Sequence, residues 1–204
     1  MNQKKRVGIM GGTFDPIHIG HLILAQAAFE QLHLDQVMFV PAGKPPHKKD
    51  KIITVTGWQR AEMVKLAIEG NDHFVLDTME IEKQSYSYTF ETLGSLCEKY
   101  PENEYYFVIG GDSLRDFHTW KHPERIAQYC HLAAAYRPQI EEGFDELLER
   151  NRQAYGDRFE KIAAPQIDIS SSDIRKRAQE GKSIRYYVPD KVYAYIAEHH
   201  LYTE

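Results

Sequence analysis

Apolar residues along the chain follow two patterns, short continuous runs and longer stretches with helical spacing. Short runs bounded by Gly or Pro are typical of buried strands, and they predict strands at 6–10, 36–40, 74–76, 105–109, 132–136 and 159–163. Apolar residues spaced three and four apart predict helices at 20–32, 56–69, 87–99, 123–128, 142–155, 171–179 and 189–200. The segment 56–69 also begins with Thr56 and Gln59 in a capping-box pattern, and Gly70 follows it.

Strand and helix patterns alternate along most of the chain. This alternation predicts an α/β fold, a Rossmann-like doubly wound parallel sheet covered by helices on both faces. We expect one α/β domain at 1–164 and a small C-terminal helical part at 165–204 packed on it. In such folds ligands bind beyond the carboxyl ends of the strands, and the unusual segments of this sequence lie just after strands or at helix starts.

Composition narrows the class of protein. Hydrophobic residues make up 42% of the chain, which is enough for a sizeable core, and the net charge is −5 with a pI near 6.1. An acidic protein is not expected to bind nucleic acid in general, although a local pocket can still hold a small anion. Cys97 and Cys130 lack the spacing of a zinc site or a disulfide framework. No stretch resembles a signal peptide or a membrane span, so we expect a cytoplasmic protein.

The segment GGTFDPIHIGH, residues 11–21, joins the first predicted strand to the first predicted helix. Gly11 and Gly12 would let the backbone approach a phosphate, and His18 and His21 would add donors at the helix start. Neither a P-loop nor a G-x-G-x-x-G pattern is present. A tight turn with packed histidines and a zinc site are the alternatives, but no third zinc ligand stands nearby. The combination of glycine turn and histidines favours phosphate binding.

This segment resembles the signature of the HxGH nucleotidyltransferases, and its GGTFDP form is similar to the bacterial nicotinate-nucleotide adenylyltransferase family. The similarity continues through GKPPHK (43–48), SYTFETL (87–93), GGDSLRDFHTW (110–120) and ISSSDIR (169–175), which together cover nearly the whole chain. The resemblance implies adenylyl transfer from ATP to nicotinate mononucleotide with Mg²⁺, giving nicotinate adenine dinucleotide and pyrophosphate. Magnesium would be held mostly by phosphates and water, so we assign no metal ligand in the protein.

The resemblance also implies roles for individual residues. We expect catalysis to depend on His18, His21 and Arg175, with His21 at the α-phosphate. The ATP-binding set is expected to comprise Gly11, Gly12, Thr13, His18, His21, Asp112, Ser171, Ser172 and Arg175, with Asp112 on a ribose hydroxyl. The mononucleotide is expected to contact Lys44 and Lys48 through its phosphate, Thr89 through the nicotinate carboxylate, and Trp120 through the pyridine ring.

Three other functions stay open at this stage. A related transferase could act on pantetheine phosphate or glycerol phosphate, and a closer one could prefer nicotinamide mononucleotide. A regulator could bind ATP without turnover. The sequence does not decide whether the chain forms a homo-oligomer, and it gives the His118 side chain no role.

Overall fold

The computed structural model describes residues 4–44, 55–83, 86–136, 143–165 and 167–203. By contact density the chain divides into two compact units. The first consists of 1–11, 24–38 and 88–166, and the second of 12–23, 39–87 and 167–204. The division that the sequence suggests, at 164/165, stays a prediction, because compactness does not test whether a segment folds independently.

The described strands form a six-stranded sheet in the order β3-β2-β1-β4-β5-β6. Their bounds are Lys5–Gly12 for β1, Gln36–Pro41 for β2, Phe74–Leu76 for β3, Asn103–Gly110 for β4, His131–Tyr136 for β5 and Phe159–Ala163 for β6. All six overlap the predicted strands. This order is that of the doubly wound dinucleotide-binding folds, in which ligands bind where the strand order reverses, between strands 1 and 4.

Helices connect the strands as the alternating pattern predicts. They are α1 (Ile19–Gln31), α2 (Gly57–Ile68), α3 (Met79–Glu82), α4 (Thr89–Lys99), α5 (Gly111–Arg115), α6 (Pro123–Tyr129), α7 (Phe144–Tyr155), α8 (Ser171–Gln179) and α9 (Asp190–Glu198), with a 3₁₀ turn, η2, at Phe117–Thr119. The short elements α3, α5 and η2 are absent from the predicted set, because four- and five-residue helices carry no measurable periodicity. The α/β, Rossmann-like class is confirmed.

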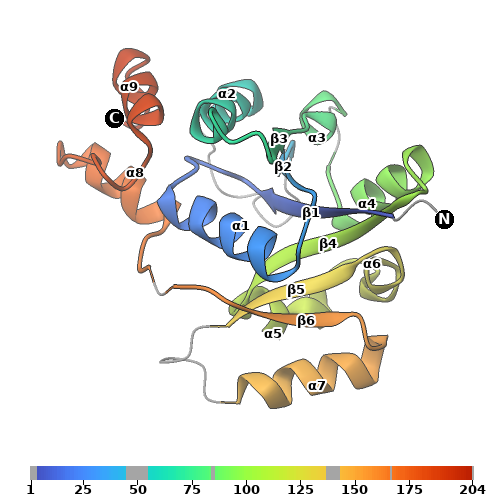
Figure 1. The fold of residues 1–204 in the computed structure, drawn as a ribbon. Helices are drawn as coiled ribbons and strands as arrows, with labels where there is room; N and C mark the ends of the chain where they lie inside the picture. Colours follow the sequence, from blue (N-terminus) through green and yellow to red (C-terminus); the bar gives the residue numbers. More distant parts are fainter. Residues whose placement is uncertain (1–3, 45–54, 84–85, 137–142, 166, 204) are drawn as a thin grey trace. The chain divides into compact units, whose positions relative to one another are not determined.

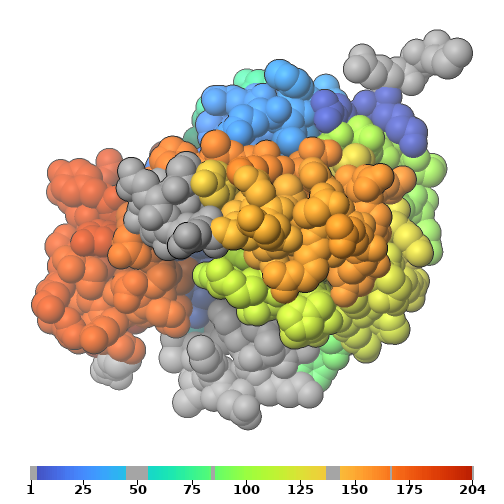
Figure 2. All heavy atoms as spheres, turned by 90° about the horizontal axis from the view of Figure 1, so that it is seen from below, coloured from blue at the N-terminus to red at the C-terminus, as the bar shows by residue number. Residues whose placement is uncertain are grey.

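The core of the first unit is a parallel sheet with continuous apolar strands. β1, β4, β5 and β6 run side by side (Figure 1), with Val7 opposite Tyr105, Phe107 opposite Leu132 and Ala134 opposite Lys161. The interiors of β4 and β5 are buried, as expected for strands covered on both faces. The helix α7 lies along β6, and the side of it that faces away from the strand is visible in Figure 2.

The second unit packs α2 against α9, and a capping box starts α2. The Thr56 side chain accepts from the Gln59 backbone N–H, and the Gln59 side chain accepts from the Thr56 N–H at 3.0 Å, so the box predicted from the sequence is confirmed. Lys191 of α9 forms an ion pair with Glu69 at the end of α2. No helix in the described segments is long and apolar enough to cross a membrane.

Candidate active site

The two histidines of the HxGH segment lie against each other at the start of α1. Their ring centroids are 3.7 Å apart, and the backbone N–H of His18 donates to Nδ1 of His21 at 3.2 Å. Since Nδ1 of His21 accepts this bond, the proton of its neutral ring lies on Nε2. His21 can therefore donate one hydrogen bond to a ligand without carrying a charge.

Burial keeps both rings neutral near pH 7. Desolvation lowers the pKa of His18 to about 4, and the pKa of His21 falls to about 3 through burial and through the neighbouring His18. His18 is 6% exposed, and its Nδ1 has no hydrogen-bond partner among the described residues. A buried polar atom that lacks a partner costs free energy, so this nitrogen is a site where a ligand contact would be stabilising.

Two glycines of the segment make room for these rings. A Cβ at Gly20 would lie 3.1 Å from Nδ1 of His18, and a Cβ at Gly12 would lie 3.1 Å from the ring of Phe14. Phe14 is buried, has a positive φ of 50°, and meets His21 edge-on at 5.0 Å. The glycines therefore serve the packing of the histidines as well as the access to the backbone that the sequence suggests.

The backbone donors at the start of α1 are largely used within the protein. The N–H of Ile19 donates to the Tyr187 carbonyl, and the N–H of His21 donates to the His18 carbonyl. The N–H of His18 donates to His21, as described above. The N–H groups of His18, Ile19 and His21 are therefore already paired, so donors for a ligand at this helix start would come from side chains such as that of His21.

Residues of α8 reach the same loop. The Ser171 hydroxyl donates to the carbonyl of Pro16 at 2.9 Å, and Nη1 of Arg175 donates to the carbonyl of Asp15 at 2.6 Å. Ser170, rather than Ser171, caps α8, with its Oγ accepting from the Asp173 N–H. Ser171, Ser172 and Arg175 thus lie on the first turns of α8, and they are brought to the loop that carries His18 and His21.

A buried arginine that the sequence analysis did not single out also fixes this loop. Arg60 of α2 is 1% exposed, and its guanidinium donates to the carbonyls of Thr13, Ala42 and Gly43. It ties the loop after β1 to the loop after β2. The sequence feature that could have revealed Arg60 is its place on the apolar face of α2, beside Ala61 and Val64. A cation is rare in such a place unless it is paired.

The first unit carries Gly11, Thr89, Asp112 and Trp120. Trp120 is half-buried. Its ring meets Phe107 edge-on at 6.1 Å and lies tilted against Phe117 at 5.6 Å. Asp112 is exposed and pairs with Arg115 at 2.9 Å. Thr89 is the first residue of α4, whose N-cap Tyr88 makes no side-chain capping bond. His118 is exposed, with Nδ1 at 3.1 Å from the Arg115 carbonyl.

Cations stand at the start of α4. Nζ of Lys121 lies 4.0 Å from the ring centroid of Tyr88, and the Arg125 guanidinium lies 5.0 Å from that of Phe90. The first-turn N–H groups of a helix have no intrahelical partner. Positive charge thus lies over the rings of the residues on both sides of Thr89, at the start of a helix, an arrangement suited to a carboxylate.

Of the two lysines expected near the mononucleotide phosphate, the structure describes one, Lys44. Lys44 is exposed and its backbone carbonyl accepts from the N–H of Ser87, which joins the loop after β2 to the segment before α4. Lys48 lies outside the described residues. The roles of both stay predictions.

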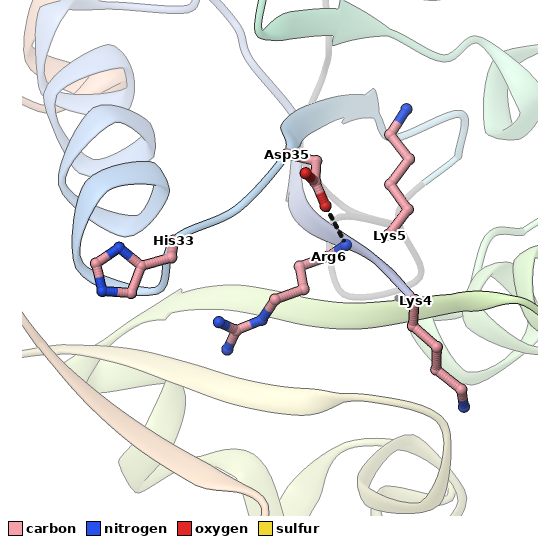
Figure 3. Close-up of a pocket in the computed structure, with 5 residues that line it drawn as sticks. All are labelled: Lys4, Lys5, Arg6, His33 and Asp35. Carbon is pink, nitrogen blue, oxygen red and sulfur yellow. Dashed lines mark hydrogen bonds between the residues drawn. The ribbon is translucent and has the colours of Figure 1, made fainter. Parts of the chain in front are cut away.

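A separate pocket of about 310 Å³ opens near the amino end of β1, lined by Lys4, Lys5, Arg6, His33 and Asp35 (Figure 3). The Asp35 carboxylate accepts from the Arg6 backbone N–H at 2.7 Å. The Arg6 side chain is engaged with Tyr106 and Glu104. In α/β sheets the ligand site is at the opposite, carboxyl ends of the strands, so we do not place the reaction here.

Comparisons with known proteins agree with this geometry. A cytidylyltransferase-like family model matches residues 9–177. The chain is 42% identical to a probable nicotinate-nucleotide adenylyltransferase of Desulfitobacterium hafniense, with 97% of this chain and 96% of the relative covered. It is 45% identical to one of Thermomicrobium roseum, with 97% and 91% covered.

Solved structures give the same fold. The nicotinic acid mononucleotide adenylyltransferase of Plasmodium falciparum complexed with NaAD matches with a TM-score of 0.81 at 21% identity, covering 97% of both chains. The same enzyme complexed with APC matches with a TM-score of 0.78 at 19% identity. By its sequence relatives and the family model, the chain belongs to the nicotinate-nucleotide adenylyltransferases of the cytidylyltransferase-like family.

Proposed function

We propose that this protein transfers the adenylyl group of ATP to nicotinate mononucleotide, giving nicotinate adenine dinucleotide and pyrophosphate. The observation that carries the proposal is the close pair His18 and His21, with the Nε2 proton of His21 left for a phosphate, in a chain of this family. The reaction belongs to the biosynthesis of NAD. We expect it to take place in the cytoplasm.

The reaction needs alignment and charge stabilisation more than acid–base chemistry. A phosphate oxygen of the mononucleotide attacks the α-phosphorus of ATP, one P–O bond forms, and the bond to pyrophosphate breaks. The attacking phosphate is ionised at neutral pH because its second pKa is about 6, so no side chain must deprotonate it. Donors aimed at the developing charge supply most of the catalysis in such sites.

The second unit provides residues for the triphosphate. His21 would donate from Nε2 to an α-phosphate oxygen, with His18, Gly12 and Thr13 beside it. Ser172 and Arg175 would bind the β- and γ-phosphates, since Ser171 already donates to the Pro16 carbonyl. Gly11 and Asp112 stay proposed contacts of ATP from the first unit, although the Asp112 carboxylate would have to share its ion pair with Arg115.

Magnesium is expected to enter as the complex with ATP. Within the described segments, no group of three His, Cys, Asp or Glu side chains is placed to hold a metal ion. The buried carboxylate on the loop, Asp15, accepts from Tyr202 and faces Arg175. The N–H donors proposed here, on His21 and Arg175, suit phosphate oxygens rather than a cation. The ligands of magnesium would therefore be phosphates and water.

The first unit provides the residues proposed for the pyridine ring and the carboxylate of the mononucleotide. Trp120 offers an aromatic ring for the pyridine, and Thr89 at the start of α4 is proposed as a donor to the carboxylate. Charge-assisted bonds to a carboxylate are roughly twice as strong as neutral ones. The cations Lys121 and Arg125 at the same helix start favour the acid over the amide. Lys44 and Lys48 are proposed for the mononucleotide phosphate.

Substrate choice tests the proposal. Purified protein with ATP and Mg²⁺ is offered nicotinate mononucleotide, nicotinamide mononucleotide, pantetheine phosphate and glycerol phosphate in parallel, and pyrophosphate release is measured. We expect nicotinate mononucleotide to react best, at least about tenfold better than the amide, because an unpaired buried donor costs about 1–3 kcal/mol.

Each of the other outcomes would contradict a different part of the proposal. Equal turnover of acid and amide would remove the role of Thr89 and the α4 start but keep adenylyl transfer. Preference for a phosphate without a pyridine ring would overturn the substrate. Tight ATP binding without pyrophosphate release from any of the four would favour a non-catalytic binder.

A further inference from the structure

The last residues of the chain return to the loop that carries the two histidines. Tyr202 is 5% exposed, and its hydroxyl donates to Oδ1 of Asp15 at 2.7 Å, across 187 positions of sequence. Both Tyr202 and His200 have positive φ, 64° and 50°. Non-glycine residues rarely adopt this region, and they persist there only where the surroundings fix them. The ring of Tyr202 is therefore held firmly against the loop.

Asp15 stands between this hydroxyl and Arg175. Its Oδ2 is 3.8 Å from Nη1 of Arg175, while the same Nη1 donates to the Asp15 backbone carbonyl at 2.6 Å. The second nitrogen, Nη2, is 3.4 Å from the Ser172 hydroxyl. The Asp15 side chain is thus near the arginine without a direct hydrogen bond to it, and the shorter contact of the carboxylate is with Tyr202.

Electrostatics make the tyrosine a dependable donor. Burial, and then the Asp15 carboxylate, raise the pKa of the Tyr202 hydroxyl well above its usual range. The hydroxyl therefore keeps its proton at neutral pH and donates it. A buried carboxylate is costly unless it is hydrogen-bonded or paired, so Asp15 would turn to another donor if the hydroxyl were removed. Two cations neighbour this carboxylate: Arg60, whose guanidinium already donates to three backbone carbonyls, and Arg175, whose Nη1 lies 3.8 Å from Oδ2. We expect the carboxylate to turn to Arg175.

We propose that Tyr202 is a positioning residue for ATP: by holding Oδ1 of Asp15, it keeps this carboxylate from closing on Arg175, and the guanidinium stays available to the triphosphate. This inference rests on the proposed role of Arg175. It gives the end of the chain a function in the active site, although Tyr202 itself contacts no phosphate.

Tyr202→Phe tests the proposal, since it removes one oxygen and keeps the ring. Binding of ATP with Mg²⁺ is measured by calorimetry without the second substrate, followed by steady-state kinetics with both. We expect ATP to bind about tenfold more weakly, as for the loss of one hydrogen bond to a charged group, and KM for ATP to rise similarly. Both kcat and KM for nicotinate mononucleotide stay within about twofold. The matched control is Tyr195→Phe on α9, whose ring stacking on His199 at 4.1 Å a phenylalanine retains.

Two double variants separate positioning from general stability. In the Arg175→Ala background, adding Tyr202→Phe changes ATP binding less than about twofold, because the side chain that it positions is gone. In the Asp15→Asn background, Tyr202→Phe also loses its effect, because no carboxylate remains to close on the arginine. All variants are compared well below their melting transitions, so that a loss of stability does not imitate a loss of binding.

Several results would overturn the proposal. One is a Tyr202→Phe protein that melts earlier but binds ATP as the wild type does. Another is an effect of Tyr202→Phe that is undiminished in the Arg175→Ala background. If Arg175→Ala itself leaves ATP binding unchanged, the proposed role of Arg175 is wrong. If it weakens binding and Tyr202→Phe does not, only the inference about Tyr202 fails.

Discussion

At the scale of single residues, the charge of the active-site histidines is set by burial. The pKa values of about 4 for His18 and about 3 for His21 lie below the ordinary value of 6.5. Both rings are thus neutral at pH 7 in the free protein, so the contribution proposed for them in ATP binding would be a neutral hydrogen bond. Cations for the phosphates must then come from arginine and lysine side chains, and two arginines, Arg175 on α8 and the buried Arg60 on α2, are hydrogen-bonded to the loop before α1.

The same shifts make folding stability depend on pH. Between about pH 6.5 and 4 the unfolded chain binds protons at these two histidines while the folded chain does not, so the free energy of unfolding falls as the pH falls through this window. From about pH 7.5 to 5, we expect each histidine to account for a loss of about 2 kcal/mol. Urea denaturation at the two pH values measures this loss.

Variants isolate the contribution of the pair from that of other titrating groups. In His18→Asn/His21→Asn the loss of stability between the two pH values should be smaller by several kcal/mol, on the order of the sum for both residues. His33→Asn is the control, since His33 is exposed and its φ of 48° is one that asparagine tolerates. An identical pH dependence in the double variant and the wild type would show that the two rings are not held neutral by the fold.

At the scale of elements, the start of α1 depends on Gly20, whose lack of a side chain leaves space for the His18 ring. Gly20→Ala places a Cβ 3.1 Å from Nδ1 of His18, so the ring has to shift, although alanine is the better helix former by up to about 1 kcal/mol. We expect turnover to fall at least about tenfold while the melting temperature stays the same or rises. Displacement of one such donor costs up to about 10²–10³ in rate. Steady-state kinetics and a thermal melt of the same sample measure the two effects.

Gly94→Ala on α4 is the matched control. Its added Cβ would meet the Tyr129 ring at 3.5 Å, an ordinary contact. This variant should keep full activity and gain stability from the same helix preference. If Gly20→Ala keeps wild-type turnover, the histidine loop has more room than its packing indicates, and the role assigned to Gly20 is wrong.

Elements with a strong local signal could be predicted from the sequence, and those fixed by distant contacts could not. The six strands and the capping box at Thr56 follow from local patterns, and the structure has them. The strand β1, however, continues to Gly12 rather than ending before the glycines, because backbone pairing extends beyond the apolar run. The helix α9 starts at Asp190, with Pro189 outside it as the N-cap.

Candidate site residues that belong to a sequence motif could be predicted. Those that are defined only by tertiary contacts could not. His18, His21 and Arg175 stand in recognisable segments. Arg60 and Tyr202 do not, because their function lies in partners 47 and 187 positions away, Thr13 and Asp15. A single sequence contains no trace of such pairs, except that an arginine on an apolar helix face needs an explanation.

At the scale of the whole molecule, some residues proposed for ATP alone and some proposed for the mononucleotide alone belong to different units. Arg175, with His18 and His21, belongs to the second unit, and Trp120 and Thr89 belong to the first. Because Arg175 is proposed to contact ATP and Trp120 the mononucleotide, their variants should act on different substrates. Arg175→Ala should raise KM for ATP and leave KM for nicotinate mononucleotide nearly unchanged. Trp120→Ala should do the reverse.

The size of the Trp120 effect follows from its ring. Aromatic stacking contributes about 0.5–1.5 kcal/mol beyond burial, so we expect KM for the mononucleotide to rise about threefold to tenfold, with ATP binding by calorimetry unchanged. Trp120→Phe should recover part of this loss, because it restores an aromatic face. Trp120 also packs on Phe107 and Phe117, so a purely structural role for its ring is the alternative, and that role predicts a different result. If Trp120→Ala lowers the melting temperature and both KM values change together, the ring is a structural one, and the pyridine of the substrate must be bound by another aromatic residue of the first unit.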